Sequence, residues 1–218
     1  MKLDHLLERN RRWSDSVKER EPDFFSELAK QQSPEYLWIG CSDSRVAANT
    51  IVGLRPGEIF VHRNIANIVT HSDMNCLSVI QFAVDVLKVT DIIVTGHYGC
   101  GGVLAAMEDK RHGFIDNWLR HIQDTASVYE EFLRSLPDDQ SRFDKLCELN
   151  VIEQVINVAE TTMLQDAWER GQSVAIHGLI YDLGDGILRD LDVTVEQRRD
   201  KRELRRKFFS KIKTAAEA

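Results

Sequence analysis

The stretch EYLWIGCSDSRV, residues 35–46, runs from an apolar segment into a polar turn. Its first half is almost wholly apolar, as expected for a parallel strand that is covered on both faces. Cys41 ends the apolar segment, and Asp43 and Arg45 follow at alternate positions. The stretch is either an ordinary strand-to-helix turn or a strand end that directs three reactive side chains to one place.

Further segments of the chain have the pattern of strands, and helical patterns separate them. The strand segments are GEIFVHR (57–63), TDIIVTGH (90–97) and SVAIHGLIYD (173–182), the last continued through the turn GDG into ILRDLDV (187–193). Helical spacing covers residues 3–31, 74–89, 99–109, 115–134 and 139–170. Strands that alternate with helices predict an α/β fold with a mainly parallel central sheet, helices on both faces and an antiparallel edge.

The segments read as one domain over residues 1–218, because no internal repeat or linker interrupts them. This domain would carry an N-terminal helical arm (1–32) and a C-terminal helix (195–218). The tail 198–213 holds nine Lys or Arg against two acidic residues and could contact RNA or an acidic membrane. Its spacing favours instead a solvated helix with Leu204, Phe208 and Ile212 packed inward, so we expect neither a nucleic-acid nor a membrane partner.

Composition and cysteine usage point to the cytoplasm. The chain has a net charge of −7 and 43% hydrophobic residues, and its start shows no pattern of a secretory signal. No stretch approaches the roughly 18 apolar residues of a membrane span. Four dispersed cysteines are too few for a disulfide scaffold, so we expect reduced thiols. Cys76 and Cys147 lie in helical apolar patterns and are expected in the core.

Cys41 and His97 end two of the predicted strands, and HYGC adds Cys100 three residues after His97. The carboxyl ends of parallel strands meet at one edge of a sheet, where ligand sites gather. Two thiolates and one imidazole are ligands that zinc prefers, and three protein ligands with one open position are typical of catalytic rather than structural sites. The sequence therefore predicts a Zn²⁺ site at this edge.

Asp43 could bind this zinc or accept a hydrogen bond from a water on it. Arg45 is spaced to hold the Asp43 carboxylate in a charge-assisted pair. With Asp43 on Arg45 the metal would be open, and with Asp43 on the metal it would be closed. Taken singly, Cys41 could be a small core residue and Asp43 a helix cap.

The segments CSDSR, FVHRNIAN and GHYGCGG resemble the signature segments of the β-class carbonic anhydrases. By this resemblance Cys41, His97 and Cys100 are zinc ligands, and Asp43 with Arg45 is the catalytic dyad. The implied reaction is the reversible hydration of CO2 to bicarbonate and a proton by zinc-bound hydroxide. The resemblance also implies a homodimer or homotetramer in which the N-terminal helices embrace a partner. The amphipathic residues 3–28 would equally suit packing against their own subunit.

Some bacterial members of this family are regulated by bicarbonate, and the chain resembles them at Trp38, Arg63 and Tyr181. The resemblance implies that bicarbonate held by these residues favours the closed state, with Asp43 on zinc. Alternatively, Trp38 and Tyr181 are core aromatics and Arg63 pairs with a carboxylate such as Asp85.

Two other functions stay open on the sequence. The same scaffold could hydrolyse a CO2 analogue such as CS2 or COS, or the protein could hold zinc without turnover. Asp43 and Arg45 argue against the second, since a purely structural site needs no carboxylate switch.

The expected ligand set also predicts the pH dependence of activity. Two thiolates neutralise the double charge of the zinc ion, so we expect its bound water to be less acidic and activity to rise toward alkaline pH.

Overall fold

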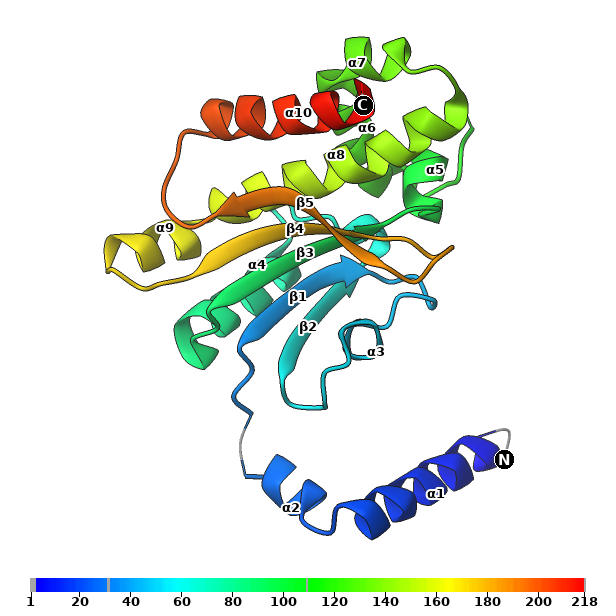
Figure 1. Ribbon diagram of the computed structural model, residues 1–218, viewed down its shortest axis with the longest axis vertical. Coiled ribbons are helices and arrows are strands. Elements are labelled where there is room, and N and C mark those ends of the chain that lie inside the picture. Colours follow the sequence, from blue (N-terminus) through cyan, green and yellow to red (C-terminus); the bar gives the residue numbers. More distant parts are fainter. Residues whose placement is uncertain (1–2, 31, 109, 218) are drawn as a thin grey trace.

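The computed structural model describes residues 3–30, 32–108 and 110–217, and these residues contain one sheet in the order β2-β1-β3-β4-β5 (Figure 1). Its strands are β1 (Tyr36–Cys41), β2 (Ile59–Asn64), β3 (Asp91–His97), β4 (Ala175–Tyr181) and β5 (Leu188–Val195). β1 pairs in parallel with β2 and β3, β3 pairs in parallel with β4, and β5 adds an antiparallel edge. The mainly parallel sheet with one antiparallel edge is therefore confirmed.

Helices occupy the segments between the strands, with more breaks than the sequence pattern predicted. After the arm helices α1 (Asp4–Arg20) and α2 (Phe24–Leu28) come α3 (Ala48–Val52), η1 (Ile65–Asn67), α4 (Met74–Gln81), η2 (Phe82–Leu87), α5 (Gly101–Met107), α6 (Asp116–Val128), α7 (Glu130–Ser135), α8 (Asp139–Ala159), α9 (Thr162–Glu169) and α10 (Lys201–Glu217). The helix expected over 139–170 is two helices, because Thr161 adopts an extended backbone conformation before α9. The C-terminal helix begins at Lys201, since β5 extends to Val195.

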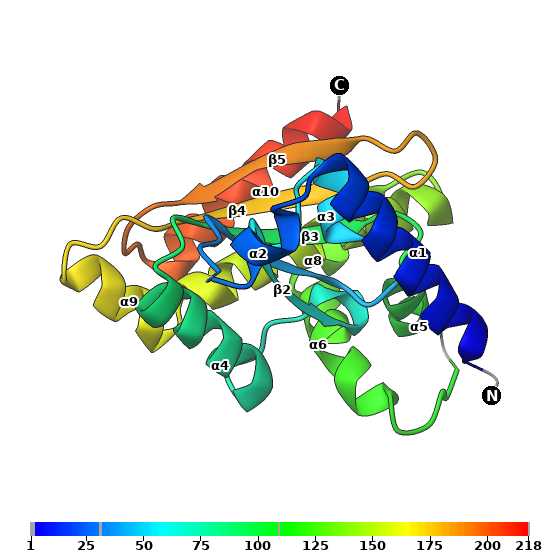
Figure 2. The same cartoon turned by 90° about the horizontal axis from the view of Figure 1, so that it is seen from below.

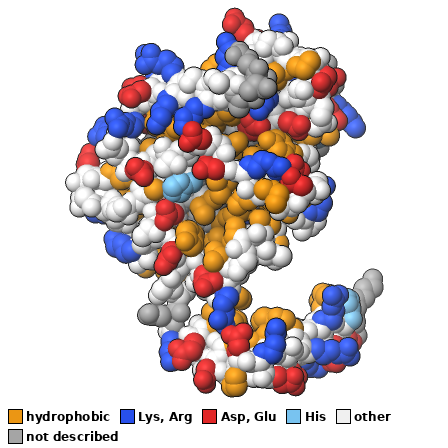
Figure 3. Space-filling model, in the orientation of Figure 1, with side chains coloured by type: hydrophobic (Ala, Val, Ile, Leu, Met, Phe, Trp, Pro, Cys, Tyr) orange, Lys and Arg blue, Asp and Glu red, His pale blue; other side chains and the backbone are white. Residues whose placement is uncertain are grey.

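The helices cover the two faces of the sheet unequally. Leu37 and Ile39 of β1 point into a large core that α4, α5, α6, α8 and α10 also line, whereas Trp38 points to the other face and packs with Ala48 of α3. In β4 the residues alternate between buried and half-buried, so part of this second face stays open. Figure 3 shows apolar side chains gathered over the strands on the face turned to the reader.

The long helix α8 forms the centre of the covered side and packs against β3, β4 and α10. α10 buries Leu204, Phe208 and Ile212, which confirms the inward packing expected of the basic tail. Cys76 and Cys147 are 0% and 2% exposed, as expected of core residues. All four cysteines are free thiols.

The arm formed by α1 and α2 stands apart from the rest of the molecule in Figure 1, and seen from below in Figure 2 it lies in front of the sheet. Arg55, in the loop before β2, joins it to the body through an ion pair with Glu21 and by lying 5.1 Å over the ring of Phe24. Leu7 and Trp13 of α1 remain about half exposed, at 55% and 48%. Among the described residues, we find no helix with the length and apolar character that crossing a membrane requires.

Candidate metal centre

Three buried side chains meet at the carboxyl edge of the sheet, as the sequence predicted. Cys41 lies at the end of β1, His97 at the end of β3, and Cys100 directly before α5. The two sulfur atoms are 3.9 Å apart, and each lies within 4.8 Å of a ring nitrogen of His97. Fold topology therefore brings together two thiols that are 59 residues apart in sequence.

The geometry of these donors fits a tetrahedral zinc ion. Two thiolates that bind one zinc at about 2.3 Å and a tetrahedral angle lie roughly 3.8 Å apart, close to the sulfur separation observed here. His97 Nδ1 donates to the carbonyl oxygen of Tyr98 at 2.9 Å, which leaves the lone pair on Nε2. That Nε2 atom is buried and has no hydrogen-bond partner in the structure. A buried imidazole nitrogen that faces two thiols and has no hydrogen-bond partner is chemically suited to bind a metal ion.

The two thiols differ in their acidity because they face each other. A hydrogen bond from Cys100 lowers the pKa of Cys41, and His97 and two backbone N–H groups lower it further against the opposing effect of burial. The hydrogen bond to Cys41 and burial raise the pKa of Cys100. Burial lowers the pKa of His97, but the Cys41 thiolate, the Tyr98 carbonyl oxygen and the Asp43 carboxylate all raise it, and the net shift is upward. A divalent cation would replace the shared protons, since metal binding requires deprotonated ligands.

Asp43 borders this centre and is held by Arg45. Its Oδ1 accepts hydrogen bonds from the backbone N and the side-chain Nε of Arg45, both at 2.9 Å, and its Oδ2 accepts one from Nη2 at 2.6 Å. The same Oδ2 lies 3.8 Å from His97 Nε2. The hydrogen bonds from Arg45 hold the pKa of Asp43 well below its usual range. The structure thus has the carboxylate on the arginine, beside the Cys41, His97 and Cys100 cluster.

A strained turn supplies a further contact that the sequence did not reveal. Ala66 has φ 61°, a left-handed conformation that is costly for a residue other than glycine. In this conformation its backbone N–H points to Cys41 Sγ at 3.4 Å. Asn150 of α8 supports the turn by donating to the Ala66 carbonyl oxygen at 2.9 Å. FVHRNIAN marked this segment in the sequence, but the role of Asn150 depends on a contact across 84 residues.

The residue after His97 links the centre to α8. The Tyr98 hydroxyl donates to Glu148 Oε1 at 2.7 Å, and Lys145 Nζ lies within 3.0 Å of both carboxylate oxygens of Glu148. This half-buried network holds Tyr98, whose backbone carbonyl oxygen accepts the His97 Nδ1–H bond. Sequence reasoning did not single out any of these three residues.

The residues of the predicted bicarbonate site lie around the same edge. The register of β1, β2 and β3 places Trp38 and Arg63 on one face of the sheet, and Tyr181 pairs with His97. Trp38 is only 1% exposed, as the alternative of a core aromatic predicted. Arg63 donates to the carbonyl oxygens of Cys41 at 2.8 Å and Asp43 at 2.5 Å. The alternative in which Arg63 pairs with Asp85 is wrong, because Asp85 accepts from Arg170.

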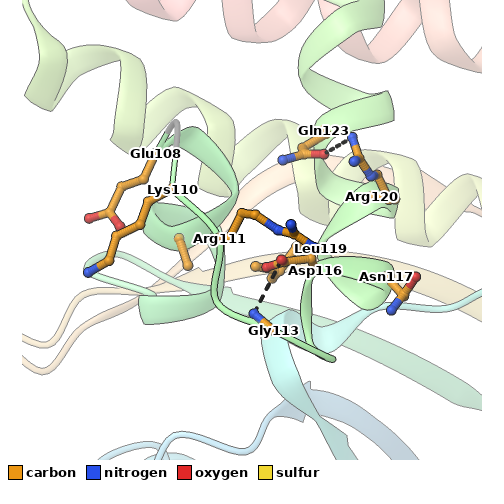
Figure 4. A pocket seen from close by; sticks show the side chains of 10 residues that line it. Glu108, Lys110, Arg111, Gly113, Asp116, Asn117, Leu119, Arg120 and Gln123 are labelled. Carbon is orange, nitrogen blue, oxygen red and sulfur yellow. Dashed lines mark hydrogen bonds between the residues drawn. The ribbon is translucent and has the colours of Figure 1, made fainter.

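A separate hollow lies beside α5 and the start of α6 (Figure 4). Its lining mixes carboxylates with cations and amides, and includes Glu108, Arg111, Asp116, Arg120 and Gln123. Part of this polar surface is already paired, since Asp116 accepts from the Gly113 N–H and Arg120 donates to Gln123. None of the residues of the metal centre lines it.

Comparison with known proteins identifies the family. Residues 36–188, which include the whole candidate metal centre, match the family model described as carbonic anhydrase. The chain belongs to the carbonic anhydrase family. A carbonic anhydrase of Emericella nidulans is 49% identical over 190 residues, covering 87% of this chain and 83% of the relative. One of Candida albicans is 38% identical and covers 91% of this chain and 71% of the relative.

Solved structures place this carbonic anhydrase in the β class. A Coccomyxa β-carbonic anhydrase in complex with acetazolamide has a TM-score of 0.87 at 36% identity, covering 95% of this chain and 97% of its own. A tetrameric β-carbonic anhydrase of Sordaria macrospora has a TM-score of 0.84 at 38% identity, covering 89% and 98%. The finer resemblance to bicarbonate-regulated bacterial carbonic anhydrases stays a prediction.

Proposed function

We propose that this carbonic anhydrase holds one Zn²⁺ with Cys41, His97 and Cys100 and catalyses the reversible hydration of CO2 to bicarbonate and a proton. The observation that supports this proposal most strongly is the buried Cys-His-Cys cluster. His97 Nε2 has no hydrogen-bond partner there, and the Asp43–Arg45 pair lies at its edge. Zinc in such a site acidifies a bound water and so supplies a nucleophile near neutral pH.

Asp43 and Arg45 are the proposed catalytic dyad. Because Arg45 keeps the pKa of Asp43 low, the carboxylate is an acceptor only and cannot donate a proton. It can therefore accept the hydrogen of a water in the open position and orient the oxygen lone pair toward CO2. The bond from Arg45 Nη2 holds the carboxylate in place.

The decisive experiment combines metal analysis with stopped-flow CO2 hydration on the purified full chain. We expect close to one tightly bound zinc per centre and rapid hydration that is lost together with zinc in Cys41→Ser. Zinc-replete protein without hydration activity at neutral or alkaline pH would refute the proposal.

We further propose that bicarbonate regulates the enzyme through Trp38, Arg63 and Tyr181, as in the bacterial members that the sequence resembles. Arg63 is exposed and uses two of its five N–H donors on the carbonyl oxygens of Cys41 and Asp43, so it has donors left for an oxyanion. An anion that draws Arg63 away would release the Asp43 carbonyl and let the carboxylate leave Arg45 for the metal. Asp43 would then be a fourth ligand in a closed state.

The bicarbonate proposal is tested by inhibition of CO2 hydration in wild type and in Trp38→Phe. Phenylalanine keeps an aromatic ring in the core but removes the indole N–H, so we expect weaker inhibition by bicarbonate with basal hydration retained. Unchanged inhibition in this variant would contradict the regulatory role.

Two other functions remain as less favoured alternatives. Hydrolysis of CS2 or COS would use the same donors and is tested by release of hydrogen sulfide from each substrate. A protein that stores zinc without turnover would have no use for a carboxylate held beside the ligands, as Asp43 is here. Fast CO2 hydration without release of hydrogen sulfide would exclude both.

We also propose that the chain forms one domain, works as a homodimer or homotetramer and is located in the cytoplasm. The apolar residues exposed on α1 suit a second copy of the chain, and the Sordaria macrospora relatives are described as tetrameric.

The proposed location rests on the two thiols at the centre. They must stay reduced to bind metal, which suits a reducing compartment. Cell fractionation would test the location.

A further inference from the structure

A second cluster of potential metal ligands lies outside the centre described above. It consists of His62 in β2, Asp73 directly before α4, and Cys76 in the first turn of that helix. One ligand atom of each of these residues lies within 4.8 Å of the others. Imidazole nitrogen, carboxylate oxygen and thiolate sulfur are the three donor types found in zinc sites.

The cluster is built into the fold rather than formed by surface side chains. His62 is 7% exposed and Cys76 is 0% exposed, whereas Asp73 is half-buried and gives the cluster an approach from solvent. Asp73 and Cys76 are three residues apart at a helix start, a spacing that places both on one side of the helix. β2 and α4 therefore present their donors to each other across the segment that joins them.

The contact with Asn64 shows which ring nitrogen of His62 carries the lone pair. Asn64 Nδ2 lies 3.3 Å from His62 Nε2, and the amide orientation of Asn64 is fixed because Asn64 bonds both the N–H and the carbonyl of Ile68. The amide is therefore the donor, and His62 Nε2 is an acceptor. An ion bound by Nε2 would take the place of this long 3.3 Å contact, while Asn64 keeps its two bonds to Ile68.

Asp73 has an oxygen left for a cation. Its Oδ1 accepts the Asn75 N–H at 3.0 Å and caps α4. The second carboxylate oxygen has no hydrogen bond among those of the described residues. A single carboxylate can thus cap the helix and contribute both a ligand atom and a negative charge to the cluster.

We propose that His62, Asp73 and Cys76 form a second site for a divalent cation of borderline softness, best matched by Zn²⁺. The mixed N, O and S donors disfavour Mg²⁺ and Ca²⁺, which prefer all-oxygen sites. With one thiolate instead of two, this site binds zinc more weakly than the centre at Cys41. An ion here would tie β2 to α4 and so brace the intervening turn at Ala66, whose N–H contacts Cys41 Sγ.

The test is zinc stoichiometry after equilibrium dialysis of the full chain against excess zinc, with wild type, Asp73→Asn and Cys76→Ser compared. We expect two zinc ions per chain in wild type and one in each variant. Asparagine at 73 retains a side-chain oxygen that can cap α4, so this variant is expected to fold even if Cys76→Ser does not. His71→Gln is the matched control, since it removes an exposed imidazole from the same loop but should keep two ions.

A second readout uses Co²⁺ added to protein whose first centre already holds zinc. Wild type should develop a thiolate-to-cobalt charge-transfer absorption that Cys76→Ser lacks. One zinc ion in wild type, or a second ion that survives both Asp73→Asn and Cys76→Ser, would overturn the proposal. Either result would leave the first centre untouched, because loss of its zinc is measured separately in Cys41→Ser.

Discussion

At the scale of single residues, the position of one carboxylate decides what the centre can do. Arg45 binds both oxygens of Asp43, and Asp43 Oδ2 is nevertheless 3.8 Å from His97 Nε2. Asp43 thus lies beside the three clustered side chains and is held by Arg45. This arrangement corresponds to the open state that the sequence predicted as one of two alternatives.

Replacing Asp43 by asparagine should lower CO2 hydration by roughly 10²-fold or more, the usual contribution of a positioned acid–base group. Asparagine keeps an oxygen for the Arg45 backbone N–H but loses the negative charge. Zinc content should stay at the wild-type level, because Asp43 is not one of the three clustered ligands. Stopped-flow hydration with metal analysis measures both quantities.

Asp85→Asn is a matched control for this prediction, since Asp85 also pairs with an arginine, Arg170, away from the centre. It should hydrate CO2 at the wild-type rate. Full activity in Asp43→Asn would show that the carboxylate has no part in the reaction.

The low pKa of Asp43 also predicts which group controls the pH profile. A carboxyl group with a lowered pKa stabilises the fold above its unfolded pKa, about 3.9, and this contribution is lost only when the pH falls through the folded value. Asp43 therefore stays ionised from pH 6 upward and cannot produce a rise at alkaline pH. We expect hydration activity to increase between about pH 7 and 9 through the water at the metal.

This profile is measured as kcat/KM for hydration across that range in wild type and in Asp43→Asn. A rise that keeps its midpoint in the variant, at lower activity, supports the assignment. Flat wild-type activity would contradict it.

At the scale of elements, α8 holds the segment that follows β2 with a row of side-chain amides. Asn150 bonds the Ala66 carbonyl, Gln154 accepts the Val69 N–H, and Asn157 bonds the Val69 carbonyl. Their spacing of four and then three residues places them on one face of the helix. This row satisfies backbone polar groups of the buried segment 66–69 and fixes the turn at Ala66.

Asn150→Ala should lower the free energy of unfolding by about 1–3 kcal/mol, because the buried Ala66 carbonyl loses its partner. The turn would also hold the Ala66 N–H less firmly against Cys41, so zinc affinity should fall. Denaturant unfolding and competition with a zinc chelator measure the two effects.

Asn157→Ala is the control on the same face of α8. It leaves the Val69 carbonyl without its amide, so it should also reduce stability. Val69 lies three residues beyond Ala66, whose N–H contacts Cys41 Sγ, so zinc affinity should fall less than in Asn150→Ala. Equal loss of zinc affinity in the two variants would show that Asn150 acts only through general stability.

At the scale of the whole molecule, the arm and the open face of the sheet are the regions where a single chain leaves apolar side chains exposed to solvent. Figure 3 shows apolar side chains over the strands and along the side of the arm that faces the body. An exposed apolar surface of this kind usually marks an interface. The arrangement is consistent with the proposed assembly through α1 and α2.

Leu7→Glu combined with Trp13→Glu should shift the protein toward smaller assemblies, because charges would then occupy the apolar side of α1. Sedimentation equilibrium measures the change. Arg11→Glu changes the charge of the same helix at an exposed position and should leave the assembly intact. An unaltered assembly in the double variant would exclude this face as the interface.

The sequence by itself determined the strands, the mainly parallel sheet and the clustering of Cys41, His97 and Cys100. Local hydrophobic patterns and reactive residues at strand ends are visible along the chain. The sequence also predicted the inward face of α10. Only the tertiary structure decided that α8 supports Ala66, that His62 meets Cys76, and that helices cover one face of the sheet more fully than the other. These features depend on hydrogen bonds and packing between distant segments, and a backbone group acquires such a partner only when the fold brings one to it.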